Sequence, residues 1–286
     1  MAALGGDVGP YGLALLSAVV HAGWNVALAR GRGAGPGVAR SAAATIAGVV
    51  VLTPLAVATW RIDATGLAWA AGSAFAEIVY FVLLGRAYRG ASVSRTYPVA
   101  RGVAPVVVLV VTVLLTGDLV PREVGAVGLV VVGVLLVAGE GGRPDGTVVR
   151  LAVPVSIAIA TYTLLDARGV QHGSPACYLW VTMAPVAVGL AVWSTVETRG
   201  VRAVRAELAS PLAWVTGAGI MLAYGLVLEA LTLARHDQVP VVAALRETSV
   251  VLVPVLAAVA ARRRPSPWVL AGSALIAVAV VLLDSV

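Results

Sequence analysis

The sequence predicts an all-α integral membrane protein whose ten transmembrane helices form two inverted five-helix repeats. The composition is the first reason, since 60% of the 286 residues are hydrophobic and only 12% are charged, with a mean hydropathy of +0.97. Soluble domains average about 45–50% apolar and about 25% charged residues. Long apolar runs and a repeat between the two halves are the other reasons. So little polar surface cannot cover a water-exposed globule.

Ten apolar stretches are long enough to cross a bilayer, which takes about 20 residues, with about 17–25 tolerated. We expect helices at 11–29, 41–60, 66–84, 97–116, 122–139, 148–165, 176–195, 211–233, 239–261 and 267–283. The first span lacks the charged lead-in of a signal peptide, so we expect it to be a retained helix. The loops are short and leave no room for a catalytic or nucleotide-binding domain outside the membrane.

The two halves repeat one another around a pair of arginines. The string TYPVARGVAPV contains Arg101, and VAALRETSVVLVP contains Arg246, each in the fourth span of its half. The first and sixth spans end alike, in NVALARG and TLLDARG, which sets Trp24 against Tyr162. We therefore expect domains at 1–145 and 146–286. Because five spans is an odd number, the second domain enters the membrane upside down.

The arginines support this topology independently. All 20 basic residues are arginines, and the sequence contains no lysine. In the first half the arginine-rich loops follow the first and third spans, and in the second half they follow the seventh and ninth. The bias reverses between equivalent loops, as an inverted repeat requires. By the positive-inside rule these loops are cytoplasmic and both termini lie outside.

Several chemistries are excluded. The absence of lysine rules out a Walker A phosphate site and a Schiff-base cofactor. The pI of about 10.1 is basic, but the arginines lie between apolar runs and not on one soluble face, so we expect no nucleic acid partner. The single Cys177 with His21, His172 and His236 has no metal-ligand spacing. The loop carboxylates are isolated, so we expect no enzyme, no metal and no cofactor.

Ionisable side chains inside the spans are candidate site residues, since each costs about 2.5–3.5 kcal/mol near a helix centre on insertion scales. In the first span His21 and Asn25 share one helix face beside Trp24. Glu77 lies inside the third span, one turn before Tyr80. We expect these residues to contact substrate, and His21 and Glu77 to be candidates for proton coupling. The alternative for His21 is a packed ring bonded to a neighbouring helix.

Arg101 lies about one turn into the fourth span, at a depth that predicts an ion pair with Glu77. Alternatively, such a pair only fastens two helices together, because breaking a buried pair is costly whatever its role. Pro105 lacks an amide hydrogen, so the carbonyl of Arg101 loses its helical partner. A helix broken beside a buried charge is a feature of transporter binding sites.

The ninth span carries Arg246 and Glu247 side by side, between Pro240 and Pro254. Consecutive helical residues point about 100° apart, so at least one of the two charges should face a central cavity. We expect both to contact substrate and Glu247 to be a third proton-coupling candidate. Three tyrosines complete the candidate binding site: Tyr97, Tyr162 and Tyr224. Alternatively, these side chains are interfacial anchors at the ends of the spans.

Small residues in the fifth and tenth spans are typical of helix packing. The set is Gly125, Gly128, Gly133, Gly272 and Ser273. We expect these two spans to form a scaffold and not to contribute to the site.

The strings TYPVARGVAPV, VAALRETSVVLVP and HAGWNVALAR resemble EamA-type members of the drug/metabolite transporter superfamily, over essentially the whole chain. The Pro-x-x-Arg-Gly-x-x-Pro pattern is moderately specific for this family and says almost nothing about substrate. The resemblance implies inverted five-helix repeats and a cavity lined by the first four helices of each half. It also implies alternating access driven by an ion or by substrate exchange, without ATP.

Two features depart from the family pattern. Small multidrug members carry a glutamate in the first helix, where this chain has His21 and Asn25. Family members usually keep both termini in the cytoplasm, opposite to the orientation that the arginine count predicts.

We therefore expect a secondary active transporter, an exporter of a small polar metabolite such as an amino acid or related carboxylate. The high arginine, alanine and valine content suggests a bacterial source, so we expect a multi-pass protein of the bacterial inner membrane, as a monomer or homodimer, coupled to a proton or another ion. Two alternatives stay open. A flippase for lipids or lipid-linked sugars needs a lateral opening to the bilayer, and a non-transporting scaffold or sensor would have its cavity filled by side chains.

Overall fold

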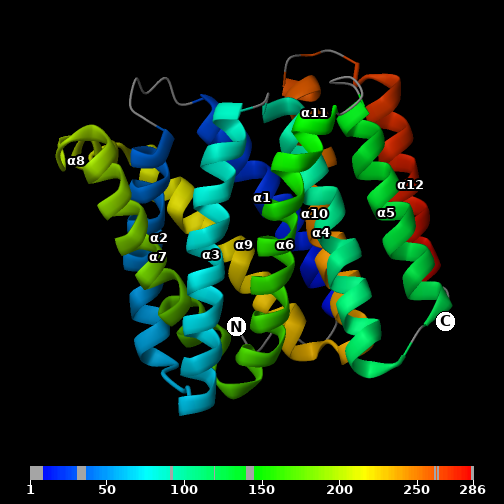
Figure 1. Ribbon diagram of the computed structural model, residues 1–286, viewed down its shortest axis with the longest axis horizontal. Coiled ribbons are helices and arrows are strands. Elements are labelled where there is room, and N and C mark those ends of the chain that lie inside the picture. Colours follow the sequence, from blue (N-terminus) through cyan, green and yellow to red (C-terminus); the bar gives the residue numbers. More distant parts are fainter. Residues whose placement is uncertain are drawn as a thin grey trace.

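The computed structural model is a bundle of long helices packed side by side (Figure 1). It describes residues 9–30, 37–90, 93–118, 120–139, 145–260, 262 and 264–284. No β-strand occurs within these ranges; one isolated bridge joins Ile62 to Gly173. The chain is therefore an all-α protein, as the sequence predicts.

The first half contains five helices: α1 (Pro10–Arg30), α2 (Gly37–Ala58), α3 (Ala64–Gly90), α4 (Val93–Thr116) and α5 (Pro121–Gly139). The second half contains α6 (Gly146–Gly169), α7 (Pro175–Thr198), the short α8 (Arg202–Leu208), α9 (Pro211–Leu233), α10 (Val239–Glu247), α11 (Ser249–Ala260) and α12 (Pro267–Asp284). Two 3₁₀ turns, η1 (Val170–His172) and η2 (His236–Gln238), precede α7 and α10.

Seven of the described helical segments are long and apolar enough to cross a membrane. They are Val38–Ala58, Ala64–Ala87, Val99–Thr116, Gly146–His172, Pro175–Thr198, Pro211–Leu233 and His236–Leu256. The chain is thus a multi-pass membrane protein. Helices α1, α5 and α12 coincide with three further expected spans but are not among the seven, so the count of ten stays a prediction.

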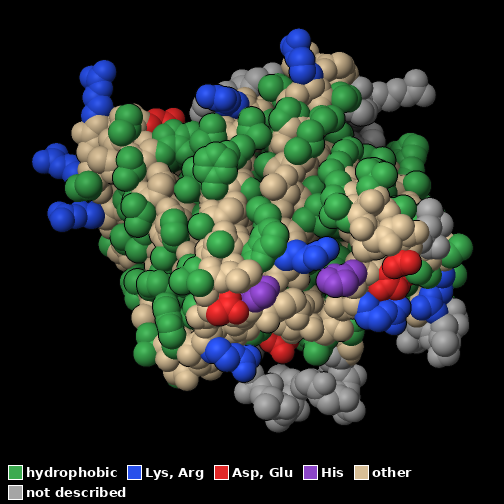
Figure 2. Space-filling view, turned by 60° about the horizontal axis from the view of Figure 1, so that its bottom comes forward, with side chains coloured by type: hydrophobic (Ala, Val, Ile, Leu, Met, Phe, Trp, Pro, Cys, Tyr) green, Lys and Arg blue, Asp and Glu red, His purple; other side chains and the backbone are tan. Residues whose placement is uncertain are grey.

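The outer surface fits a lipid environment. On the face shown in Figure 2, hydrophobic side chains cover much of the upper part, and charged side chains lie at the left and upper margins and across the lower part, where the end of the bundle is turned toward the viewer. Large apolar side chains such as Phe75, Leu114 and Val196 point outward and are mostly exposed. In water this surface would be highly unfavourable, so the apolar flank is explained by burial in a bilayer.

Contacts between helices follow the same pattern in both halves. The contact of α3 with α6 has a counterpart in the contact of α9 with α1. The contact of α4 with α6 has a counterpart in the contacts of α10 and α11 with α1. Helix α2 packs on α9 as α7 packs on α3. The pairs α2–α7 and α5–α12 contact each other directly.

The ninth expected span is interrupted at its centre, where α10 ends at Glu247 and α11 begins at Ser249. The amide of Thr248 bonds to the carbonyl of Leu245 at 3.2 Å, a three-residue step that tightens the backbone into a local 3₁₀ turn. Helix α4, by contrast, continues through Pro105. The discontinuity expected beside Arg101 is found instead directly after Arg246 and Glu247.

Helices α5 and α12 lie together at one edge of the bundle (Figure 1). A Cβ atom on Gly272 would lie 2.5 Å from the carbonyl oxygen of Gly133, so only glycine permits this approach. The predicted packing role of these two glycines is confirmed. Gly128 has no described atom within 4 Å of its Cβ position and is not a packing position.

Candidate functional site

A cavity of about 280 Å³ lies among the helices, and α1, α2, α3, α4, α6, α7, α9 and α10 all contribute to its lining. None of the described residues of α5 or α12 lines it. Eight of the predicted site residues do: His21, Trp24, Glu77, Tyr80, Arg101, Tyr162, Tyr224 and Arg246. Residues far apart in the sequence therefore meet where the hydropathy pattern and the repeat predict a site.

Arg101 makes a buried ion pair with Glu247. The Nη1 atom of Arg101 donates to the two carboxylate oxygens of Glu247 at 2.9 and 3.2 Å, and the side chains are 7% and 2% exposed. The predicted pair between Arg101 and Glu77 is therefore wrong. The reason is that α4 packs against α10 far more extensively than against α3, so Glu247 reaches the guanidinium.

Arg246 presents its guanidinium to the cavity. Its Nη2 atom donates to the hydroxyl of Tyr162 at 2.5 Å, and its Cζ atom lies 5.4 Å from the centre of the Tyr162 ring. Its Nε atom lies 3.5 Å from Glu247. A guanidinium has five N–H donors, and no described acceptor takes the others. Arg246 can therefore still bind an anionic group of a ligand.

His21 and Trp24 form the α1 wall of the cavity. The Nε2 atom of His21 lies 3.5 Å from Nη2 of Arg101, which only donates, so a hydrogen bond between them requires Nε2 to be the acceptor. A protonated His21 would place a second positive charge beside the Arg101 guanidinium, and its role in proton coupling stays a prediction. The Nε1–H of Trp24 is buried and has no acceptor among the described residues. A ligand oxygen would satisfy it.

Asp166 is a buried carboxylate that the hydropathy pattern does not predict. It is 1% exposed and accepts hydrogen bonds from Ser73 at 2.6 Å, Tyr178 at 3.1 Å and Tyr224 at 2.5 Å. These donors come from α3, α7 and α9. The predicted span ends at 165, which assigns Asp166 to a loop, whereas α6 continues to Gly169. Extending the predicted span by one helical turn would have placed Asp166 inside the membrane helix and identified it as a candidate.

Glu77 lies in the cavity wall, close to this buried aspartate. It is buried and lines the cavity together with Tyr80, Tyr162 and Tyr224. Three tyrosine rings continue the wall, with ring centres 6.0 Å apart between Tyr80 and Tyr162 and 6.4 Å apart between Tyr162 and Tyr224. Tyr162 and Tyr224 thus face the cavity and are not interfacial anchors.

One described member of the predicted site, Glu247, does not line the cavity. It is buried, and its carboxylate is paired with Arg101. Asn25 and Tyr97 belong to α1 and α4, but their side chains lie outside the described part of the structure.

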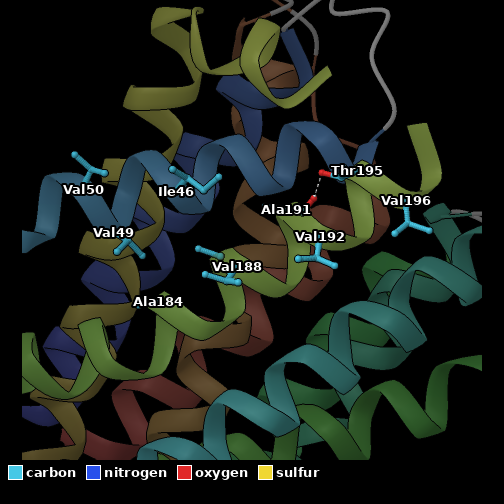
Figure 3. A pocket seen from close by; sticks show the side chains of 10 residues that line it. Ile46, Val49, Val50, Ala184, Val188, Ala191, Val192, Thr195 and Val196 are labelled. Carbon is cyan, nitrogen blue, oxygen red and sulfur yellow. Dashed lines mark hydrogen bonds between the residues drawn. The ribbon is translucent and has the colours of Figure 1, made fainter. Parts of the chain in front are cut away.

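A larger hollow, of about 480 Å³, is an open groove between α2 and α7 (Figure 3). Valine and alanine side chains line it, and Val188, Val192 and Val196 are exposed. Its one hydroxyl, on Thr195, donates to the carbonyl of Ala191 at 2.7 Å. The groove has no group that recognises a polar molecule, so the smaller cavity is the candidate site.

Two ion pairs lie at the ends of membrane-crossing segments. His172 Nδ1 lies 3.1 Å from a carboxylate oxygen of Asp63. The amide of Gly66 and the His172 ring hold the pKa of Asp63 below its usual value by hydrogen bonding to the ionised form. Arg235 donates to the carboxylate of Asp237 at 2.8 Å.

Comparisons with known proteins define the fold and no more. The chain matches no family model and no curated protein. Several solved structures are similar to it, and one crystal structure among them has a TM-score of 0.73 and 17% sequence identity over 94% of this chain and 95% of the other. At that identity the similarity shows a shared fold across nearly the whole length of both chains.

Proposed function

We propose that the chain is a secondary active transporter that carries a small polar metabolite through this cavity by alternating access. The observation that carries the proposal is the cavity itself, in which charged and aromatic side chains from distant segments converge among membrane helices. Charged groups in that environment are costly and mark substrate or ion pathways. Arg246 supplies unused N–H donors there, and Glu77 supplies a carboxylate.

The size and chemistry of the cavity favour an amino acid or a related carboxylate. About 280 Å³ lies just below the range of about 300–1,000 Å³ typical of small-molecule pockets. Arg246 and the Trp24 N–H suit a carboxylate, Glu77 suits an amine, and the tyrosines suit an apolar part. The volume is small for a lipid-linked sugar, which weighs against a flippase. A scaffold or sensor would have its cavity filled by side chains, so the empty volume of this cavity weighs against that alternative.

The same proposal includes ten spans in two inverted repeats, at 1–145 and 146–286. The matched helix contacts support it, because each pair has its counterpart five spans further along the chain. Arg101 and Arg246, equivalent in the repeat, both reach the cavity. The reversed arginine bias of the loops is independent support. Such symmetry provides two related conformations, open to opposite sides of the membrane.

The remaining parts of the proposal concern the setting. The protein resides in a bacterial inner membrane as a monomer or homodimer, exports its substrate, and is driven by an ion or by exchange, without ATP. It resembles EamA-type transporters of the drug/metabolite superfamily.

A thermal-shift screen tests the substrate class, because a ligand that binds the folded state raises the melting temperature by mass action. The purified chain is heated with amino acids, organic acids, nucleosides and quaternary amines. We expect a shift with an amino acid or carboxylate that Arg246→Ala abolishes and Arg235→Ala, outside the cavity, preserves. Labelled ligand should then exchange across proteoliposomes. Shifts with quaternary amines alone, or an unchanged shift in Arg246→Ala, would refute the site.

A further inference from the structure

The open groove between α2 and α7 has the length of one membrane leaflet (Figure 3). Ala187 is buried in it, whereas Val188 and Val192 are exposed. Its α7 side extends from Ala184 to Val196, about 18 Å of helix at about 1.5 Å per residue. One leaflet takes half of a hydrocarbon core that is about 30 Å thick. A single acyl chain therefore matches the groove in length and in its apolar character.

The groove begins at the end of the bundle where α8 lies. Helix α7 ends just beyond the groove, and there the amide of Arg199 bonds to the carbonyl of Thr195, which belongs to the lining. Helix α8 packs against both α2 and α7. Beside it, the indole N–H of Trp214 donates to the carbonyl of Leu208 at 3.0 Å, and the Trp214 side chain is 41% exposed. Exposed tryptophans at helix ends mark the membrane interface. The groove thus lies in the leaflet that borders α8.

Three exposed arginines, the arginine cluster, follow the groove directly in the chain: Arg199, Arg202 and Arg205. Among the described residues, none of the three forms an ion pair. Of the two neighbouring acidic residues, Glu207 lies 3.5 Å from Arg40, and Glu197 is exposed. Basic side chains project from the left margin of Figure 2, the side on which Figure 1 shows α8. This end of the groove is therefore positively charged.

We propose that the groove holds one acyl chain of an anionic phospholipid and that the arginine cluster binds its phosphate. Guanidinium groups bind phosphate through charge-assisted hydrogen bonds that are often bidentate. The positive-inside rule predicts that this end of the bundle faces the cytoplasm, and the cytoplasmic leaflet carries the anionic lipids. The apolar lining contacts the chain, and the arginines select a negative head group. The site does not depend on what the central cavity carries.

A second copy of the chain fits the same groove poorly. Two copies in one bilayer have the same orientation, so a symmetric pair has its two-fold axis along the membrane normal. The arginine clusters of the two copies would then lie at the same level and close together, where like charges repel. A phospholipid instead brings the opposite charge to this place.

Thermal unfolding of the purified full-length chain in detergent micelles tests the site, because a lipid that binds the folded state raises the melting temperature. The titrants are phosphatidylglycerol, phosphatidylcholine with the same acyl chains, and glycerol phosphate, which has no chain. We expect phosphatidylglycerol to act at a concentration at least tenfold lower than phosphatidylcholine. Glycerol phosphate should have no effect, and native mass spectrometry should find a single retained phosphatidylglycerol.

Substitutions in the arginine cluster test the head-group contact. Arg202→Gln and Arg205→Gln should each weaken the binding of phosphatidylglycerol about fivefold. Arg199→Gly should do the same without lowering stability, because Arg199 has a positive φ of 54° that glycine adopts more readily. Arg150→Gln is the matched control, since Arg150 is exposed at the start of α6, at the same end of the bundle, and should keep the wild-type affinity.

A substitution inside the groove tests the acyl-chain contact. Ala191→Phe places a ring in the groove and should weaken the binding of phosphatidylglycerol at least tenfold. Val281→Phe adds the same ring at a position on α12 that is 67% exposed, and should keep the wild-type affinity. A melting temperature of lipid-free Ala191→Phe near the wild-type value shows that the variant folds.

Four results would overturn the proposal. Equal effects of phosphatidylglycerol and phosphatidylcholine on the wild type, which need no variant to fold, would indicate ordinary solvation of the flank by lipid. An effect of glycerol phosphate would indicate a site for free phosphate. Unchanged affinity in a folded Ala191→Phe would place the acyl chain elsewhere. A lipid-free dimer that Ala191→Phe converts to a monomer would assign the groove to a second copy.

Discussion

The ion pair between Arg101 and Glu247 allows a quantitative test of how the cavity is held together. In Glu247→Gln the guanidinium keeps its position but loses the charge that neutralises it. Both side chains are almost fully buried, so water cannot replace the lost partner. Removing one partner of a buried pair costs about 3–5 kcal/mol in proteins where this has been measured. We expect Glu247→Gln to lower the free energy of unfolding by that amount.

The magnitude follows from the geometry of the contact. Nη1 of Arg101 binds both carboxylate oxygens, at 2.9 and 3.2 Å, and the same carboxylate also lies 3.5 Å from Arg246. One substitution thus leaves two guanidinium groups without this counterion. The pair joins α4 to α10, so its loss also loosens the contact beside the break before α11.

Chemical unfolding in mixed micelles, followed by tryptophan fluorescence, measures the change. Glu207→Gln is the matched control, because Glu207 lies 3.5 Å from Arg40 with both side chains partly exposed. Such a pair contributes about 0–1 kcal/mol. Replacing both buried partners by apolar residues, as Arg101→Met with Glu247→Leu, should recover most of the loss. The reasoning would be refuted if the free energy of unfolding of Glu247→Gln lay within about 0.5 kcal/mol of the wild-type value, because ordinary surface substitutions vary by that much.

Two further predictions concern packing and pH. Gly272→Val should lower the unfolding free energy by about 1–3 kcal/mol, because its Cβ would lie 2.5 Å from a carbonyl oxygen of α5. Gly128→Val, which meets no described atom, should change it far less in the same denaturation assay. For Asp63, the Gly66 amide and His172 lower the pKa in the folded state, so the stabilisation is present above the unfolded pKa and lost as pH falls below about 4. Melting curves against pH should therefore show a weaker acid dependence in Asp63→Asn, and an identical dependence would contradict this.

Helix positions and much of the site were predictable from single residues. A bilayer imposes one length and one polarity on every span, so apolar runs mark the helices without knowledge of their partners. Charges inside those runs are costly and few, so Glu77, Arg101 and Arg246 stand out, and all three line the cavity. The glycines of α5 and α12 can also be recognised in the sequence as helix-packing residues, and Gly133 and Gly272 do pack together.

Contacts between helices were not predictable in this way. Depth along a span says which residues lie at one level but not which way each helix is rotated. Glu77 and Glu247 were therefore equally available to Arg101, and the packing of α4 on α10 decides for Glu247. Asp166 escaped notice because it lies one residue past the predicted end of its span, where hydropathy cannot separate a last helical turn from a loop.

The sequence by itself determined the class of this protein, the course of its helices and the few buried charges, because the solvent of a membrane protein acts on each residue separately. Only the tertiary structure decided how those charges are shared. It joins Arg101 to Glu247, leaves Arg246 facing the cavity, and surrounds Asp166 with three hydroxyls near Glu77. Hydrogen bonds and ion pairs depend on distances of a few tenths of an ångström between side chains on different helices, and only the packed bundle defines these distances.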